Sequence, residues 1–95
     1  FPKSLVARLG GEEFCILMTD TDNELASRRL NKFREKLAQN PITVDNQEIW
    51  VTASFGVTNF IEDHLDLQLN RADKLLYEAK NDGRNRVYND SDANF

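Results

Sequence analysis

A pair of glycines divides an apolar stretch near the start of the chain. Residues 5–9 are a short apolar run rich in strand-forming side chains, and residues 14–18 continue it after Gly10-Gly11 and two acids. Two such runs separated by a glycine step predict an antiparallel hairpin, because glycine adopts the positive φ that a tight turn needs. The second run is apolar on both faces, which favours a strand covered above and below.

An amphipathic helix is predicted after the hairpin. The segment 21–24 matches a capping box, with Thr21 as the N-cap and Glu24 at the third helical position. Apolar residues then recur at helical spacing, with charged residues between them. These apolar residues are Leu25, Ala26, Leu30, Phe33 and Leu37. Asn40-Pro41 is expected to end the helix, since the residue before a proline disfavours helical geometry.

The second half of the chain predicts a hairpin, a helix and one further strand. Residues 42–44, a turn at 45–47 and a long arm at 49–57 form the hairpin, and an acidic loop follows at 59–66. A second amphipathic helix begins near Leu67 and ends at Asp82-Gly83, with Gly83 at the C′ position. Residues 86–88 predict an edge strand, and residues 89–95 are expected to form a disordered tail.

The predicted order is therefore ββαββαβ, an α/β (α+β) sandwich with helices packed on a sheet. A helical crossover normally returns to a strand beside its origin, so a strand before Leu5 would complete a ferredoxin-like βαββαβ pattern. The sequence supplies no such strand and opens on Phe1-Pro2 rather than Met. We therefore expect these residues to be the C-terminal part of a domain truncated at its N-terminus.

Composition excludes several classes of protein. The 95 residues allow one small domain, and 12 Lys and Arg against 16 Asp and Glu give a net charge of −4. A surplus of acids argues against nucleic-acid polymers and anionic membranes as main partners. Cys15 is the only cysteine, which rules out an intrachain disulfide. No apolar run approaches the ~18 residues of a membrane span, so a cytoplasmic location is expected, although a longer parent protein could be membrane-tethered.

The hairpin turn is a candidate site for a nucleotide and its metal. Gly10 and Gly11 would let a ligand approach the backbone, and Glu12 and Glu13 place two carboxylates beside them. Oxygen-rich sites of this kind suit Mg²⁺, which also binds substrate phosphates. The alternative is a tight turn whose acids simply face solvent.

The end of the second helix is a candidate phosphate site. Lys80 and Arg84 are four residues apart, so both cations can reach one side of the helix end and hold a triphosphate. The alternative is that they only complement the helix dipole. His64 lies in the acidic loop without a second His or a Cys beside it, and no metal role is expected for it.

Together these segments resemble one family. The turn at residues 8–14 resembles the signature of GGDEF domains in its GGEEF form, residues 52–57 resemble a strand of that family, and residues 72–85 resemble its last helix. The resemblance covers residues 5–88, so residues 1–95 are identified as a partial GGDEF domain. It implies a ferredoxin-like, palm-type nucleotide cyclase fold.

The resemblance implies a diguanylate cyclase. Such enzymes condense two GTP molecules into cyclic di-GMP and two pyrophosphates, with Mg²⁺ or Mn²⁺ as cofactor and one GTP on each half of a homodimer. By position, Glu12 would be the catalytic carboxylate and a metal ligand, and Glu13 a second metal ligand. Glu12 would assist deprotonation of the attacking 3′-hydroxyl.

The remaining site residues follow from the same resemblance. Gly10 and Gly11 would let the nucleotide lie against the turn, and Lys80 and Arg84 match the pair that binds its terminal phosphates. Family members also have an upstream half with a metal-binding Asp and guanine-binding residues. Because these would precede Phe1, we expect the chain alone to be inactive. The resemblance also implies that the parent has an upstream sensory or receiver domain.

The inhibitory product site of the family is expected to be missing. Its Arg-x-x-Asp motif would fall on Phe1 and Ser4, and neither side chain can replace the guanidinium or the carboxylate. We therefore predict no feedback inhibition through this site. Two alternative functions are a degenerate module that binds GTP or dimerises without turnover, and an interaction fragment that self-associates through exposed strand edges.

Overall fold

The computed structural model describes residues 4–59 and 63–90, which form two helices and six short strands. In chain order these are β1 (Ser4–Gly10), β2 (Glu13–Met18), α1 (Asn23–Gln39), β3 (Ile42–Val44), β4 (Gln47–Ile49), β5 (Phe55–Val57), α2 (Leu65–Asn81) and β6 (Val87–Asn89). The strands pair as β1–β2, β3–β4 and β5–β6. The predicted mixture of helices and strands is confirmed, with one strand more than the predicted order.

The predicted first hairpin is present. Its antiparallel register runs from Ser4 opposite Met18 to Arg8 opposite Phe14, and shifts before Gly10 pairs with Glu13. Gly10 and Gly11 have φ values of 146° and 53°, a geometry that favours glycine. The Arg8 guanidinium donates two hydrogen bonds to the Gly11 carbonyl, at 2.8 and 3.0 Å. The exposed side chain of Arg8 therefore braces the turn.

Helix α1 begins one residue later than the capping box predicted. The N-cap is Asp22 and not Thr21, because Asp22 Oδ1 accepts a hydrogen bond from the Leu25 N–H at 2.8 Å. The Thr21 hydroxyl donates instead to the Thr19 carbonyl at 2.7 Å. Residues Ala26, Ser27 and Leu30 form the buried face of the helix.

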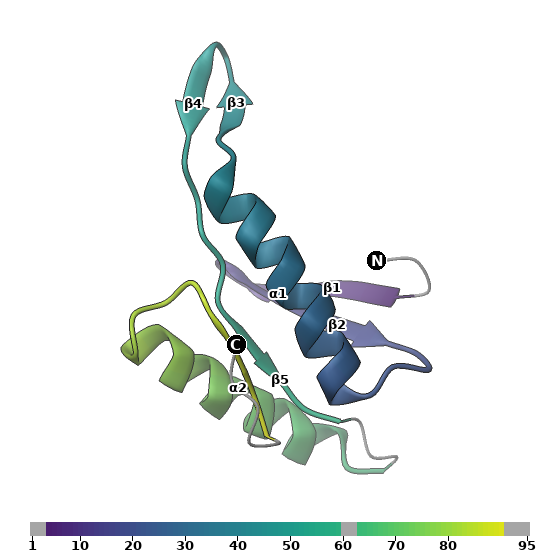
Figure 1. Cartoon of the computed structure of the whole chain (residues 1–95). Helices are drawn as coiled ribbons and strands as arrows, with labels where there is room; N and C mark the ends of the chain where they lie inside the picture. Colours follow the sequence, from purple (N-terminus) through teal and green to yellow (C-terminus); the bar gives the residue numbers. More distant parts are fainter. Residues whose placement is uncertain (1–3, 60–62, 91–95) are drawn as a thin grey trace.

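The second hairpin is shorter than predicted. Residues Asp45 and Asn46 have φ values of 50° and 65°, so β3 and β4 are joined by a two-residue turn. The long arm predicted at 49–57 was wrong, because β4 ends at Ile49 and regular pairing resumes only in β5. Figure 1 shows the β3–β4 hairpin extending beyond the C-terminal end of α1, away from the other strands.

Strands β5 and β6 with the intervening α2 form a parallel βαβ unit. A Cβ added to Gly56 would lie 2.1 Å from the Ala72 carbonyl oxygen, so α2 lies directly on β5. The core contains Ala26, Leu30, Val57 and Val87, with Ile16, Met18 and Phe55 packed against it. All buried residues among those described therefore lie in this βαβ unit or in α1, and Figure 1 shows these elements close together.

Two boundaries near the end of the chain differ from prediction. Helix α2 begins at Leu65, two residues before the predicted start, and β6 extends to Asn89. Asn89 is buried and donates from Nδ2 to the Ser27 hydroxyl at 2.9 Å, so the predicted disordered tail does not begin at residue 89. Asp90 Oδ1 accepts a hydrogen bond from Asn23 Nδ2 at 2.7 Å, and residues 91–95 of the predicted tail lie outside the described residues.

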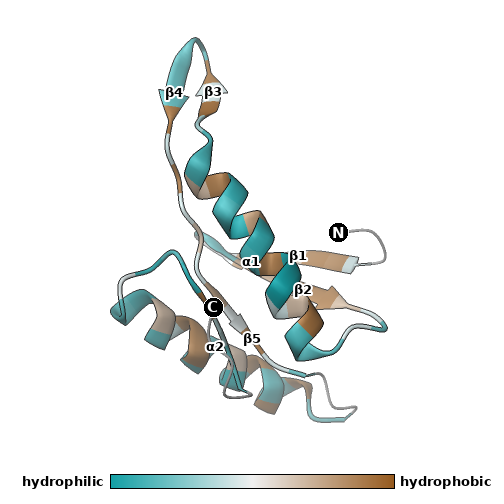
Figure 2. Cartoon of the chain, viewed as in Figure 1, coloured by the Kyte–Doolittle hydropathy of each residue, from teal (hydrophilic) through white to brown (hydrophobic). Residues whose placement is uncertain are grey.

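The β1–β2 hairpin is less covered than its sequence predicted. In the described part of the chain, β2 pairs with β1 alone, and Phe14 is 61% exposed. Leu5, Val6 and Leu9 on β1 are exposed as well. Figure 2 shows apolar colouring along both strands.

Within the residues described, no helix is long and apolar enough to cross a membrane.

Candidate active site

The acidic turn and the end of α2 lie side by side. Lys80 Nζ is 3.8 Å from Glu12 Oε1 and 3.6 Å from Glu13 Oε1. Lys80 is in the last turn of α2, more than sixty residues after the turn in the sequence. The fold thus joins two of the segments that the sequence singled out, and places a cation between two carboxylates.

These ion pairs are open to water. Glu12 is 83% exposed and Glu13 42% exposed, so solvent screens both contacts with Lys80. Each pair contributes at most about 1 kcal/mol to stability. Pairs this weak can exchange partners, and a phosphate or a metal ion can replace either side of the contact without a large cost.

Arg84 lies beyond the helix that contains Lys80. Helix α2 ends at Asn81, and Gly83 follows with a φ of 123°, as the predicted C′ glycine requires. The Arg84 N–H donates to the Ala79 carbonyl at 2.9 Å, which closes the loop back onto α2. Arg84 itself is exposed and has a φ of 63°. Among the described contacts, Lys80 reaches the two glutamates and Arg84 does not.

The turn is open enough to accept a nucleotide. A Cβ added to Gly10 or Gly11 would meet no atom within 4 Å, so the space beside this backbone is free. Their positive φ values, and not lack of room, are what favour glycine at these two positions. Ligand atoms can therefore approach the peptide groups between Arg8 and Glu12.

The donor set of the turn fits Mg²⁺ or Mn²⁺. Within residues 4–59 and 63–90, no three His, Cys, Asp or Glu side chains gather as a metal cage. Mg²⁺ is commonly bound by one or two carboxylates, with waters and substrate phosphates as its other ligands. Two adjacent, exposed carboxylates match that requirement, so Glu12 and Glu13 would hold the ion together with a bound nucleotide.

Comparison with known proteins identifies the family. Residues 2–86 match the family described as diguanylate cyclase, GGDEF domain. The chain belongs to the GGDEF family. It is 38% identical over 86 residues to diguanylate cyclase A of Treponema denticola, and 38% identical over 82 residues to diguanylate cyclase DgcZ of Escherichia coli. Each alignment covers 85% of this chain but only 22% and 28% of those relatives.

Solved GGDEF domains have the same fold. The active GGEEF domain of a Vibrio cholerae diguanylate cyclase matches 95% of this chain with a TM-score of 0.75 and 32% identity. The GGDEF domain of DgcB from Caulobacter crescentus, solved in complex with c-di-GMP, matches 94% with a TM-score of 0.80 and 27% identity. This chain covers 58% and 54% of those two structures. The predicted fold class is therefore confirmed.

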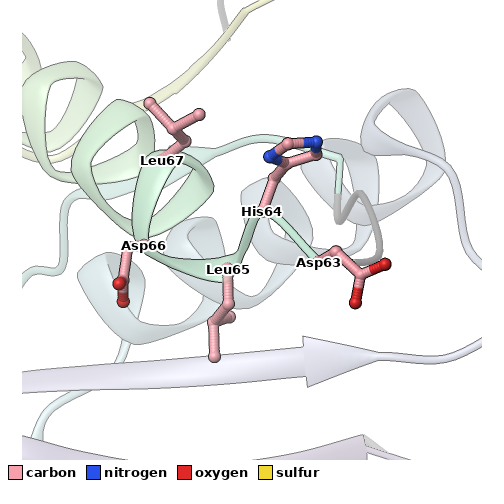
Figure 3. Close-up of a pocket in the computed structure, with 5 residues that line it drawn as sticks. All are labelled: Asp63, His64, Leu65, Asp66 and Leu67. Atoms are coloured by element: carbon pink, nitrogen blue, oxygen red, sulfur yellow. The ribbon is translucent and has the colours of Figure 1, made fainter.

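A hollow at the start of α2 lies away from the GGDEF turn. It is lined by five consecutive residues, Asp63, His64, Leu65, Asp66 and Leu67. Figure 3 shows their side chains pointing in different directions around the first turn of the helix. Leu65 and Lys80 are fifteen residues apart on α2, which corresponds to about 22 Å along a helix. The side chains do not converge on a common point, so this hollow is a poor ligand site.

Sequence reasoning missed the residues that hold the site in shape. Arg8 was only part of the motif, yet its guanidinium closes the GGDEF turn onto the Gly11 carbonyl. Asn85 and Ser54, which are 31 residues apart, form a hydrogen bond of 3.0 Å that ties the Arg84 loop to the start of β5. The hydropathy pattern contains no signal for such polar contacts, because each depends on the tertiary fold.

Proposed function

We propose that the protein containing this chain is a diguanylate cyclase, which joins two GTP molecules into cyclic di-GMP and releases two pyrophosphates. One observation is its main support: Lys80 lies within 3.6 to 3.8 Å of both Glu12 and Glu13. That contact places a carboxylate pair, suited to a metal, next to a cation suited to phosphate. Phosphoryl transfer needs this combination of charges more than it needs covalent catalysis.

Glu12 is proposed as the catalytic carboxylate and Glu13 as its partner in the metal site. In each half-reaction the 3′-oxygen of one GTP attacks the α-phosphorus of the other. The bond to the bridging oxygen breaks, and pyrophosphate leaves with its electron pair. Glu12 assists removal of the 3′-hydroxyl proton, which makes the oxygen a better nucleophile. Bound Mg²⁺ or Mn²⁺ would supply positive charge to the phosphates.

Lys80 and Arg84 are proposed to bind the terminal phosphates. Both are cations near the end of α2, and the departing pyrophosphate has several negative charges that they can balance. Gly10 and Gly11 leave free space beside the turn for the nucleotide. The product contains two identical phosphodiester bonds, so we propose that two copies face each other as a homodimer, with one GTP on each.

Location and regulation are proposed on the same basis. GTP places the reaction in the cytoplasm, and an upstream sensory or receiver domain would control dimerisation. We expect no product inhibition at the Arg-x-x-Asp position, since Ser4 at its second end lacks a carboxylate. Phe1, at its first end, lies outside the described residues.

The test is synthesis of cyclic di-GMP by the protein that contains this chain, incubated with GTP and Mg²⁺. Glu12→Gln removes the charge at nearly constant volume and is expected to lower turnover by about 100-fold or more, a range typical of lost acid–base and metal functions. Glu48→Gln, an exposed glutamate in β4, is the matched control and should leave the rate unchanged. Product formation that survives Glu12→Gln would show that the site is misassigned.

A second function, GTP binding without turnover, is favoured by one observation. Only two carboxylates come together among the described residues, fewer than a preformed metal cage provides. On this proposal the 95-residue chain binds GTP through Lys80 and Arg84 but releases no pyrophosphate. Titration of the chain with GTP, followed by a pyrophosphate assay of the same sample, distinguishes binding alone from catalysis.

A further inference from the structure

The loop after α2 has an unusual backbone. Gly83, Arg84 and Asn85 have consecutive positive φ values of 123°, 63° and 49°. Glycine adopts this region freely, but a long side chain such as that of arginine is disfavoured there. Arg84 therefore keeps this conformation only if neighbouring groups hold the loop.

Arg34 of α1 is one of the groups that hold it. Its Nη1 donates to the Asn85 carbonyl oxygen at 3.2 Å and to Asn85 Oδ1 at 3.0 Å. On the other side of the loop, the Asn85 N–H donates to the Ser54 hydroxyl at 3.0 Å. Asn85 is thus held from α1 and from the start of β5, directly after Arg84.

The guanidinium of Arg34 is itself fixed and enclosed. Its side chain is 15% exposed, its Nε donates to Asn31 Oδ1 at 2.8 Å, and its Nη2 lies 3.6 Å from Glu35 Oε1. All three guanidinium nitrogens therefore have partners within the protein. Arg34 is occupied by these contacts and can influence a bound phosphate only through the loop that it holds.

We propose that Arg34 is a positioning residue for the phosphate site, and that it holds Asn85 so that Arg84 keeps its left-handed conformation beside the end of α2. This inference rests on the proposed role of Arg84 in GTP binding. A planar guanidinium donates in several fixed directions at once, whereas lysine has a single ammonium group and cannot reach Asn31, Glu35 and Asn85 together. Arg34→Lys keeps the charge and removes this geometry.

The first experiment compares the wild-type chain, Arg34→Lys and the matched control Arg29→Lys. Arg29 is an exposed arginine on the same helix. GTP with Mg²⁺ is the probe, and amide hydrogen exchange is measured at Arg84 and Asn85, whose N–H groups are hydrogen-bonded in the native loop. Arg34→Lys should weaken GTP binding about tenfold, a loss typical of charge-assisted hydrogen bonds, and should speed exchange at both amides. Arg29→Lys should change neither.

The second experiment repeats Arg34→Lys in an Arg84→Ala background. If Arg34 acts through Arg84, its substitution should have no further effect on GTP affinity there. An equal loss in both backgrounds, or unchanged affinity and exchange in Arg34→Lys alone, overturns the inference. If Arg34→Lys does not fold, Asn85→Gly removes the Oδ1 acceptor but keeps left-handed freedom. That variant should weaken binding about threefold, and unchanged binding would again refute the inference.

Failure of the proposed function gives a different pattern. In that case Lys80→Ala and Arg84→Ala would leave GTP affinity at the wild-type level. Amide exchange would still report whether Arg34 holds the loop, because that measurement needs no ligand. Faster exchange in Arg34→Lys without any dependence of GTP binding on Arg84 would overturn the phosphate role and leave a loop of structural importance only.

Discussion

The two halves of the candidate site lie on regions of very different construction. The acidic turn is at the tip of the β1–β2 hairpin, where Leu5 is 67% and Phe14 61% exposed. Lys80 and Arg84 belong to the β5–α2–β6 unit, where Val87 and Ala79 are fully buried. The whole chain exposes 7105 Å², against about 5,600 Å² for a folded monomer of this mass. Five large apolar side chains of the hairpin are exposed, those of Leu5, Val6, Leu9, Phe14 and Leu17.

This contrast indicates that the packed region mainly supports stability, whereas the hairpin mainly presents groups for ligand binding. The cations lie on a packed frame that fixes their backbone, whereas the carboxylates lie on a ribbon held by its own ladder, by Arg8 and by the packing of Ile16 and Met18. The two regions already meet where Lys80 faces Glu12 and Glu13, so a ligand bound there would bridge them. Substitutions should therefore unfold the chain when they alter the packed region and alter mainly binding when they alter the hairpin.

The largest difference is expected between two glycines. In Gly56→Ala the new Cβ would lie 2.1 Å from the Ala72 carbonyl oxygen and 2.6 Å from the Leu76 nitrogen, so β5 and α2 must separate. We expect a loss of about 3 kcal/mol or more in the free energy of unfolding. In Gly11→Ala nothing lies within 4 Å, and only the φ of 53° opposes alanine, at about 1 kcal/mol. Urea denaturation followed by circular dichroism measures both. Equal losses in the free energy of unfolding for the two variants would contradict the difference between the packed region and the hairpin.

A similar contrast is expected for two valines. Val87 is completely buried in β6, and Val87→Ala should cost about 2 kcal/mol through lost contacts and the cavity left behind. Val6 is more than half exposed on β1, and Val6→Ala should cost less than about 0.5 kcal/mol. The same denaturation experiment applies. A large loss in Val6→Ala would mean that the hairpin is covered in solution, for example by a second copy, which a concentration-dependent midpoint would reveal.

The sequence predicted the local elements better than their partners. The Gly10-Gly11 turn, the turn predicted at 45–47 and both amphipathic helices follow from local chemistry and are present, although Gln47 belongs to β4. The arm predicted at 49–57 is divided between β4 and β5, and this depends on which strands pair with each part. The parallel pairing of β5 with β6 depends on how α2 packs. The period-2 pattern of the arm specifies its two faces but not a partner for each residue.

The site shows the same limit. The residue types and their spacing within each motif predicted carboxylates at the turn and cations at the end of the second helix. The contact of Lys80 with Glu12 and Glu13 could not be derived from spacing, since it joins segments more than sixty residues apart. The sequence singled out no role for Arg34, and its contact with Asn85 is visible only once α1 and the loop are placed together.

A smaller effect is expected where the hairpin continues into the packed region. Asp22 Oδ1 caps α1 through the Leu25 N–H, and Asp22→Ala should lower the free energy of unfolding by about 1 kcal/mol. Thr21→Ala is the matched control, because the Thr21 hydroxyl bonds to Thr19 and not to the helix; it should cost less than about 0.5 kcal/mol. The capping box predicted from sequence requires the opposite order, so thermal denaturation of the two variants decides between the two caps.

The smallest effect on stability concerns the contact that joins the acidic turn to α2. Lys80→Met keeps most of the side-chain volume but removes the charge that faces Glu12 and Glu13, and both ion pairs are solvent-screened. We expect the free energy of unfolding to fall by less than about 1 kcal/mol, and the difference from wild type to shrink at high salt. Without the lysine, the two carboxylates have no cation between them and should bind Mg²⁺ more tightly in the absence of nucleotide, while GTP binding weakens. Titrations with Mg²⁺ alone and with GTP measure these opposite changes. If both affinities fall together, Lys80 holds the hairpin in place rather than competing with the metal for its carboxylates, and the two regions depend on each other more than their packing indicates.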